Sequence, residues 1–458
     1  MTNSDKNENP IILYEIIKYL LNIFQQIHDS KLWNKKNTSF LWMSARPAVG
    51  WESHFIATKA YIQFALSISD KSFMPKLLNK IDKTVAALHY GTDGKQIFRT
   101  HGSTPIYKLP DNVTDLGQLN EIMYQKYTRP LDHALASIGT NKDTIVLNIN
   151  HLAADGGYLH NLFEFLKTDE DINYIPSIIP TEKVFEKEIN EYNGSLPLFP
   201  VADPSLTRAI PQDQLNYHTA YGMFTNNISI DAKTLMTSKI NGKIKNLTEY
   251  YWASVILSVS AFNNKLENTG IPTCINLRQY LNKSDFNIGN CFSHVIVSTH
   301  VTKDDDVKTL MDNLRQDFNN KYKLRTPIGE LKSLKQGSLF QASVKGLVPD
   351  ISLNGTFKME KPFKDMRIDL GTIDGSNASI LCFIGYSIVN GNQNTLFGKL
   401  RHPSGDISDN EAKTLLSSFH YGLQNISPNM KIGEVFDMLR DHQMNFKKSL
   451  QKEIQMMI

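Results

Sequence analysis

A proline-crowded stretch in the middle of the chain is the feature that most constrains how this sequence can fold. Between residues 168 and 216 the regular apolar patterns stop, and six prolines follow one another: Pro176, Pro180, Pro197, Pro200, Pro204 and Pro211. Proline ends helices and is excluded from interior strands, because its ring fixes φ and it has no backbone N–H to donate. The sequence therefore predicts an N-terminal half over residues 1–167, a linker or crossover over residues 168–216, and a C-terminal half over residues 217–458.

Helical and strand patterns mix along both halves. Apolar residues that recur every three or four positions predict helices, and strict alternation predicts strands. We predict helices over residues 11–27, 52–67, 75–88, 120–127, 158–166, 248–263, 304–320 and 408–424 and from residue 432 onward, and strands over residues 131–138, 144–150, 223–230, 272–276, 292–299, 380–389 and 393–400. Because no strict strand–helix–strand alternation runs through the chain, we expect an α/β fold of the mixed α+β kind, built in two halves.

Composition narrows the classes of function. Hydrophobic residues make up 41% and charged residues 21% of the chain, which excludes wholesale disorder. The 49 Lys and Arg residues against 46 Asp and Glu leave a net charge of +3, so we expect no nucleic-acid partner. Three cysteines, Cys274, Cys291 and Cys382, lie far apart without a CxxC pair. They predict neither a disulfide framework nor a zinc site, and they fit a reducing, cytoplasmic compartment.

The sequence motifs of several enzyme classes are missing. The chain contains no GxSxG nucleophile elbow, no GxxxxGK[ST] or GxGxxG phosphate loop, and no kinase signature. It also contains no HExxH, and its 13 histidines lack the paired spacing of metal ligands, so we predict no metal site. The absence of these motifs leaves either a reaction that only a few side chains catalyse or no reaction at all.

One short segment carries the residues for such a reaction. His151 ends the predicted strand over residues 144–150, and Asp155, Gly156 and Gly157 follow it. Histidine is the side chain whose ordinary pKa suits proton abstraction near neutrality. The two glycines allow a sharp turn and the close approach of other groups. The residues alone leave two interpretations open: His151 is a general base that Asp155 orients, or His151 is a core histidine and Asp155 the N-cap of the helix that follows.

The segment Asn150–Gly157 resembles the HxxxD(G) motif of the CoA-dependent acyltransferase superfamily. That group includes chloramphenicol acetyltransferases, plant BAHD enzymes, condensation domains of peptide synthetases and fungal alcohol acetyltransferases. The resemblance covers most of the chain, because further segments are similar in the same order: Asn246–Phe262 to the Thr-led buried helix, Ile271–Leu281 to a strand and its Asn-Leu-Arg turn, Asn287–Ser298 to the Gly-Asn segment, and Arg367–Gly375 to the place of the second motif. The chain looks most similar to the yeast alcohol O-acetyltransferase and sphingoid-type N-acetyltransferase branch.

Two positions depart from the family pattern. Asn150 stands where many members carry a second histidine, which is not the base. Asp369-Leu370-Gly371 is at most a remnant of the plant DFGWG motif.

The resemblance implies a fold and a set of site residues. It implies two chloramphenicol acetyltransferase-like halves, each a mixed β-sheet flanked by helices, with an active-site tunnel between them. His151 and Asp155 take the positions of the catalytic motif, with His151 as the general base and Arg278 as the structural partner of Asp155. Gly156, Gly157 and Asn290 fall in the vicinity of the substrate and its oxyanion.

The resemblance also implies an activity. An acetyl group would pass from acetyl-CoA, a co-substrate and not a bound cofactor, to the hydroxyl or amine of a small apolar acceptor, with no covalent enzyme intermediate. The alternatives are a condensation-like protein that needs a carrier-bound donor, and an inactive binding module. We expect a monomer, with peripheral contact to endoplasmic reticulum or lipid droplets through the terminal amphipathic helices. In the helix from residue 432 onward, Lys447, Lys448 and Lys452 lie near the apolar face.

Overall fold

The structure is a computed structural model of the chain, and it describes residues 45–101, 104–172, 174–198, 202–213, 223–236, 239–240, 243–281, 286–336, 344–372 and 380–457. Residues Arg46–Ile458 cluster into one compact unit. The helix expected over residues 11–27 lies outside the described residues.

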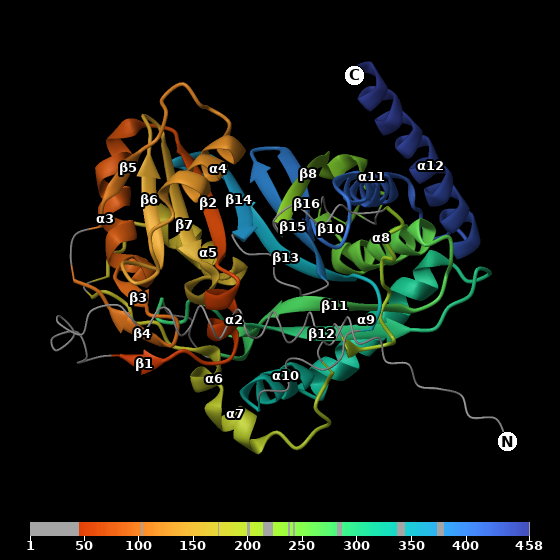
Figure 1. The fold of residues 1–458 in the computed structure, drawn as a ribbon, viewed down its shortest axis with the longest axis horizontal. Coiled ribbons are helices and arrows are strands. Elements are labelled where there is room, and N and C mark those ends of the chain that lie inside the picture. Colours follow the sequence, from red (N-terminus) through yellow and green to blue (C-terminus); the bar gives the residue numbers. More distant parts are fainter. Residues whose placement is uncertain are drawn as a thin grey trace, which may run out of the picture. The chain divides into compact units, whose positions relative to one another are not determined.

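The first sheet has five strands in the order β14-β2-β7-β6-β5 (Figure 1). Their bounds are Phe363–Thr372 for β14, Ala60–Ile68 for β2, Thr144–Asn150 for β7, Ala136–Thr140 for β6 and Ile106–Lys108 for β5. Only β5 and β6 pair in parallel, and the other neighbours are antiparallel. Helices cover both faces: Phe64 and Leu147 share a core with α5 (Gly156–Lys167), and Ala65 and Val146 share another with α4 (Leu116–Tyr127).

The second sheet has six strands in the order β12-β11-β13-β15-β16-β8. Their bounds are Phe292–Thr299 for β12, Thr269–Asn276 for β11, Val348–Lys358 for β13, Ile380–Asn390 for β15, Gln393–Pro403 for β16 and Met223–Asp231 for β8. Strand β13 runs parallel to β11 and β15, and the remaining pairs are antiparallel. The sheet is therefore mixed, as the sequence predicts for the fold class.

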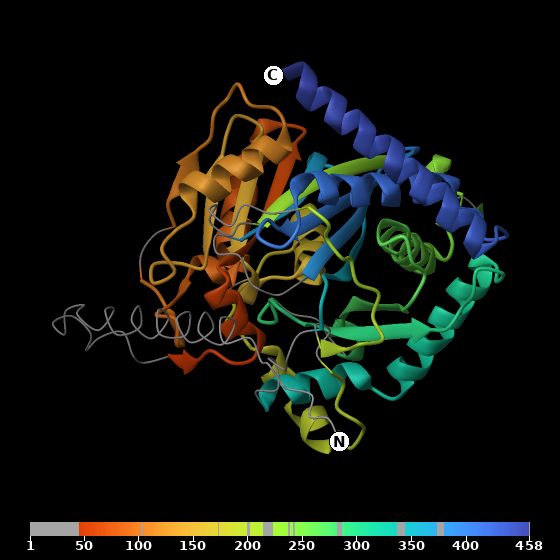
Figure 2. The same cartoon turned by 45° about the vertical axis from the view of Figure 1, so that its right-hand side comes forward.

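Helices α8 (Leu247–Phe262), α11 (Asp409–Asn425) and α12 (Ile432–Met457) pack against one another beside this sheet (Figure 2). Helix α8 is hydrophobic on all sides, and it is buried from Glu249 to Phe262 because neighbouring elements surround it. In α12 the apolar face of the first turns, from Ile432 to Leu439, is buried in the protein body. Among the described residues no helix is both long and apolar enough to cross a lipid bilayer.

Shorter elements connect these layers. The remaining strands are β1 (Arg46–Pro47), β3 (Tyr90–Thr92), β4 (Gln96–Arg99), β9 (Lys239–Ile240) and β10 (Lys243–Ile244). The remaining helices are α2 (Trp51–Ala57), α3 (Met74–Thr84), α6 (Thr181–Val184), α7 (Glu186–Glu191), α9 (Val307–Lys323) and α10 (Thr326–Lys335), with 3₁₀ turns η2 (Lys71–Phe73), η3 (Ala86–Leu88), η4 (His151–Ala153), η6 (Ala232–Thr234) and η7 (Leu277–Tyr280). The proline-rich stretch thus contains two short helices, α6 and α7.

Several predicted elements need correction. The helix predicted over residues 52–67 is wrong, because α2 ends at Ala57 and β2 follows it. Strand β2 is buried along its whole length inside the first sheet, so its sequence is apolar on both faces and lacks the alternation of a half-exposed strand. The strand predicted from residue 131 begins only at Ala136, after a turn. Strands β7 and β12 have the predicted bounds.

One strand does not follow the division of the sequence into halves. Strand β14 lies within residues 217–458, yet it pairs with β2 from Phe363↔Ile68 to Thr372↔Ala60. The first sheet is therefore completed by a strand from the other side of the proline-rich stretch. The domain boundaries themselves remain a prediction.

Candidate active site

The HxxxDGG segment connects β7 to α5. After Asn150, the last residue of β7, the chain makes the 3₁₀ turn η4, which places His151 directly beyond the sheet. The Asn150 side chain caps this turn, because its Oδ1 accepts a hydrogen bond of 3.1 Å from the Leu152 N–H. Asn150, where the family often has a histidine, is thus a buried residue that shapes the turn.

The imidazole of His151 lies among aromatic rings. Its ring stacks on that of Phe55 from α2, with centroids 4.1 Å apart and planes 6° apart. The Phe292 ring of β12 lies 5.9 Å away on centroids. Burial lowers the pKa of His151 to about 4. A hydrogen bond to its own backbone and the charge of the Asp155 carboxylate raise the pKa, but by less. At neutral pH the ring is therefore uncharged and able to accept a proton.

Asp155 and Arg278 form a buried ion pair. Arg278 Nη1 lies 2.8 Å and 2.9 Å from the two Asp155 oxygens, and the two side chains are only 5% and 6% exposed. The Asp155 carboxylate also accepts hydrogen bonds from the backbone N–H of Tyr158 (2.7 Å) and of Cys291 (2.6 Å). The first of these caps α5, so Asp155 is both the N-cap and the partner of an arginine.

Arg278 ties this pair to the second sheet. Its Nη2 donates to the carbonyl oxygens of Ile288 (2.7 Å) and Gly289 (3.0 Å). The Asp155 N–H donates to the same Gly289 oxygen at 3.1 Å. The motif of one half is thereby fixed to loops of the other, which holds the end of β7 in place.

The glycines of the motif serve close packing. Both lie in the first turn of α5, and neither has a positive φ, so the sharp turn expected there is wrong. A Cβ on Gly157 would lie 2.6 Å from Asn276 Nδ2 and 2.7 Å from Arg278 Nη1, and one on Gly156 would overlap the side chain of Asn354. Side chains of β11, η7 and β13 therefore pack closely against these two positions and favour glycine there.

Asn290 contacts the backbone of the histidine. Its Nδ2 donates to the His151 carbonyl oxygen at 3.0 Å, and its own carbonyl accepts a short hydrogen bond of 2.6 Å from Thr181 Oγ1. The structure therefore brings His151, Asp155, Gly157, Arg278 and Asn290 into one network at the junction of the two sheets.

Sequence reasoning missed the residues of α2 that enclose His151. Trp51, His54 and Phe55 lie on this short helix, and the Trp51 ring is 5.8 Å from that of Phe55 and 5.2 Å from that of Phe292. Burial, and then the charge of Arg401, lower the pKa of His54 to about 4. The available signal in the sequence was Trp51 followed three and four positions later by His54 and Phe55.

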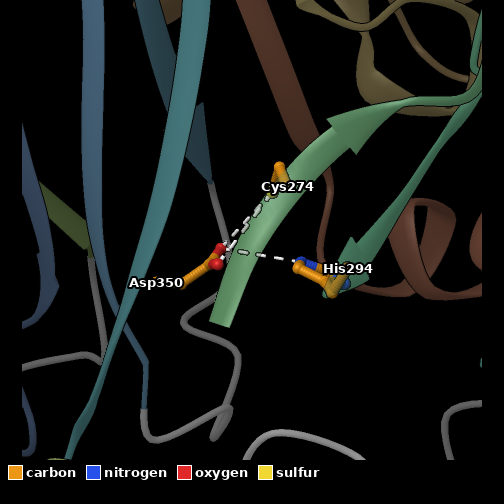
Figure 3. A group of neighbouring side chains, drawn as sticks. All are labelled: Cys274, His294 and Asp350. Carbon is orange, nitrogen blue, oxygen red and sulfur yellow. Dashed lines mark hydrogen bonds and ion pairs between the residues drawn. The ribbon is translucent and has the colours of Figure 1, made fainter. Parts of the chain in front are cut away.

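A second group of reactive side chains was also missed. Cys274, His294 and Asp350 lie on the neighbouring strands β11, β12 and β13, and their side chains converge (Figure 3). One potential ligand atom from each lies within 4.8 Å of the other two. The expectation of no zinc site was based on spacing along the chain. That spacing does not reveal that β11 and β12 pair with Cys274 opposite His294.

Comparison with known proteins shows the fold. No protein-family model matches the chain, and no curated protein sequence matches it. Among solved structures, the epimerization domain from the third module of tyrocidine synthetase B is 13% identical, with a TM-score of 0.57 over 87% of this chain and 98% of that one. Polyketide synthase associated protein 5 from Mycobacterium tuberculosis is 12% identical, with a TM-score of 0.56 over 83% and 97%.

A third similar structure contains a ligand. A variant of the starter condensation domain of rhizomide synthetase, in complex with C8-CoA, is 11% identical, with a TM-score of 0.57 over 84% of this chain and 96% of that one. At this level of identity the likeness concerns the fold and leaves the activity open. The chain therefore has the chloramphenicol acetyltransferase-like fold of the condensation and epimerization domains.

Proposed function

We propose that this chain is a CoA-dependent acyltransferase and that His151 is its general base. The observation that carries the proposal is the imidazole at the end of β7, which is enclosed by Phe55 and Phe292, in a segment that the Asp155–Arg278 pair fixes to the second sheet. The fold supports it, since a structurally similar condensation domain has been solved with C8-CoA bound.

In the proposed step, His151 removes the proton from the hydroxyl or amine of the acceptor while that atom attacks the thioester carbonyl. The tetrahedral intermediate then collapses, the carbon–sulfur bond breaks, and the protonated His151 returns the proton to the leaving CoA thiolate. General base catalysis contributes about 10²–10⁴-fold. Positioning of the two substrates and stabilisation of the oxyanion supply the rest of the acceleration.

Asp155 acts in this scheme as a positioning residue. Its carboxylate is occupied by Arg278 and by the N–H groups of Tyr158 and Cys291. Gly156, Gly157 and Asn290 keep the loops close together, and the Asn290 amide holds the His151 carbonyl.

The finer parts of the proposal concern substrates and location. We propose acetyl-CoA as the donor co-substrate, with no permanently bound cofactor, and a small apolar alcohol or amine as the acceptor, as in the yeast branch that the sequence resembles. The chain would act as a monomer. We further propose peripheral attachment to endoplasmic reticulum or lipid droplets through α12, whose exposed Met444 lies beside Lys447 and Lys448.

A test of the activity uses the purified full chain, radiolabelled acetyl-CoA and a panel of alcohols, sterols and long-chain amines. Product should form with the wild type, and His151→Ala should lower the rate at least about 100-fold while the melting temperature stays within a few degrees. A folded His151→Ala protein that acylates at the wild-type rate contradicts the assignment of the base. Fusions of residues 428–458 to a fluorescent protein test the membrane proposal, which a wholly cytosolic fusion contradicts.

The second candidate function is condensation with a carrier-bound donor, favoured by the similarity to a condensation domain and an epimerization domain. The same assay, run in parallel with a carrier-bound acyl donor, separates it from the first, because a protein of this kind would transfer the acyl group faster from the carrier protein than from free acyl-CoA. An inactive binding module would show no turnover with either donor.

A further inference from the structure

The cluster formed by Cys274, His294 and Asp350 has the donor set of a metal centre. It combines a sulfur, an imidazole nitrogen and a carboxylate oxygen on three adjacent strands of one sheet (Figure 3). Cysteine and histidine favour zinc and similar transition metals, whereas magnesium and calcium prefer sites built from oxygen ligands alone. The chemistry of the three ligands therefore selects a divalent transition metal.

The separations between the donor atoms fit such an ion. The Asp350 Oδ2 atom lies 3.7 Å from Cys274 Sγ and 3.7 Å from His294 Nε2. Zinc bonds of about 2.0–2.3 Å in a tetrahedron place the ligand atoms roughly 3.3–3.6 Å apart. All three donor atoms lie within 4.8 Å of one another, so side-chain rotations would bring them together around one ion.

A second carboxylate fixes the orientation of the histidine. Glu330 of α10 lies with Oε1 3.0 Å from His294 Nδ1, so the other ring nitrogen, Nε2, is the one that faces Asp350. Glu330 Oε2 in turn accepts hydrogen bonds from the His294 N–H at 2.6 Å and from the Ser293 hydroxyl. A carboxylate on the far nitrogen is the usual support of a metal-binding histidine, because it sets the tautomer and holds the ring.

The cluster is enclosed. The side chains of His294, Glu330 and Asp350 are 9%, 6% and 13% exposed. Arg401 of β16 lies close by, because its Nη2 is 3.3 Å from Cys382 Sγ and Cys382 pairs in register with Asp350. A ligand bound among these side chains would be largely shielded from water.

From this arrangement we infer that Cys274, His294 and Asp350 bind a zinc-class divalent metal ion, with Glu330 supporting His294. Three protein ligands leave one tetrahedral position to a non-protein ligand, as in catalytic zinc sites. The inference is independent of the proposed transfer reaction, because metal binding is measured without substrates. The Phe292 ring lies 5.5 Å from that of His294 and 5.9 Å from that of His151, so the same ring borders both the cluster and the proposed base.

The experiment uses the metal-depleted full chain and titrates it with Co²⁺, followed by competition with Zn²⁺ against a chromophoric chelator. One equivalent of Co²⁺ should bind and give the near-ultraviolet absorption of a thiolate–cobalt bond, and Zn²⁺ should displace it. This measurement on the wild type needs no variant, so it stands even if a substitution prevents folding. Failure of the wild type to bind either ion at micromolar concentration overturns the inference.

Variants then assign the ligands. Cys274→Ser should abolish the thiolate band, His294→Gln and Asp350→Asn should weaken binding at least about tenfold, and Glu330→Gln should weaken it about 10–100-fold while the band remains. Cys382→Ser is the matched control on the neighbouring strand and should leave band and affinity unchanged. A band that survives Cys274→Ser, a band lost in Cys382→Ser, or full affinity in the His294 and Asp350 variants overturns the assignment.

Discussion

Breaking the ion pair between Asp155 and Arg278 should destabilise the protein strongly, because both charges are almost completely removed from water. Removing one partner of a buried pair leaves the other charge uncompensated, which typically costs about 3–5 kcal/mol. Arg278→Ala removes the two contacts to Asp155 and also the hydrogen bonds to the carbonyl oxygens of Ile288 and Gly289. In Asp155→Ala the N-cap of α5 is lost as well, which adds about 1 kcal/mol.

Two further variants separate the contributions. Asp155→Asn retains the Oδ1 atom that caps the Tyr158 N–H, but it removes the charge and replaces the acceptor Oδ2 by an NH2 group that faces the Cys291 N–H and Arg278 Nη1. It should therefore be less destabilising than Asp155→Ala by at most the value of the cap. The double variant Asp155→Ala/Arg278→Ala should cost clearly less than the sum of the two single variants, since it leaves no lone charge behind, whereas each single variant does.

The assay is the free energy of unfolding from urea titration, supported by the melting temperature. The matched control is the exposed pair of Lys308 and Asp312 on α9, whose side chains are 65% and 59% exposed. Lys308→Ala should change the stability by less than about 1 kcal/mol. Strict additivity of Asp155→Ala and Arg278→Ala, or costs no larger than that of the control, would refute the reasoning from burial.

Two further predictions concern the same region. Gly157→Ala should destabilise the protein by about 1–3 kcal/mol, because its Cβ would lie 2.7 Å from Arg278 Nη1. Gly94→Ala, with open space around its Cβ but a positive φ, measures the cost of backbone strain without crowding. A Gly157→Ala protein as stable as the wild type would contradict the crowding argument. Burial holds the pKa of His151 at about 4 against an ordinary value of 6.5, so the unfolded chain binds this proton first and the unfolding free energy should fall as the pH drops from 6.5 to 4. His151→Gln should flatten that dependence in urea titrations at several pH values, with the parts due to His54 and His402 remaining, and an unchanged pH dependence would show that folding does not lower the pKa of His151.

Part of this protein follows from its sequence alone. The mixed fold class, the strands at residues 144–150 and 292–299, and the position of His151 at the end of a strand all follow from local patterns, because side-chain periodicity reports which face of an element is buried. The placement of Asp155 before a helix follows from its N-cap chemistry. The pairing of Asp155 with Arg278 was an implication of the family resemblance, and the structure contains that contact.

Other features required the tertiary structure. Strand β2 is buried on both faces, so its sequence carries no alternation and was mistaken for a helix. The insertion of β14 beside β2, and the stacking of Phe55 on His151, join residues that are far apart in the chain. Cys274, His294 and Asp350 meet only because β11 lies between β12 and β13 in the second sheet, with Cys274 in register with His294. Local sequence specifies which face of a segment is apolar, whereas strand order and register arise from the packing of the whole chain, and those decide which reactive side chains become neighbours.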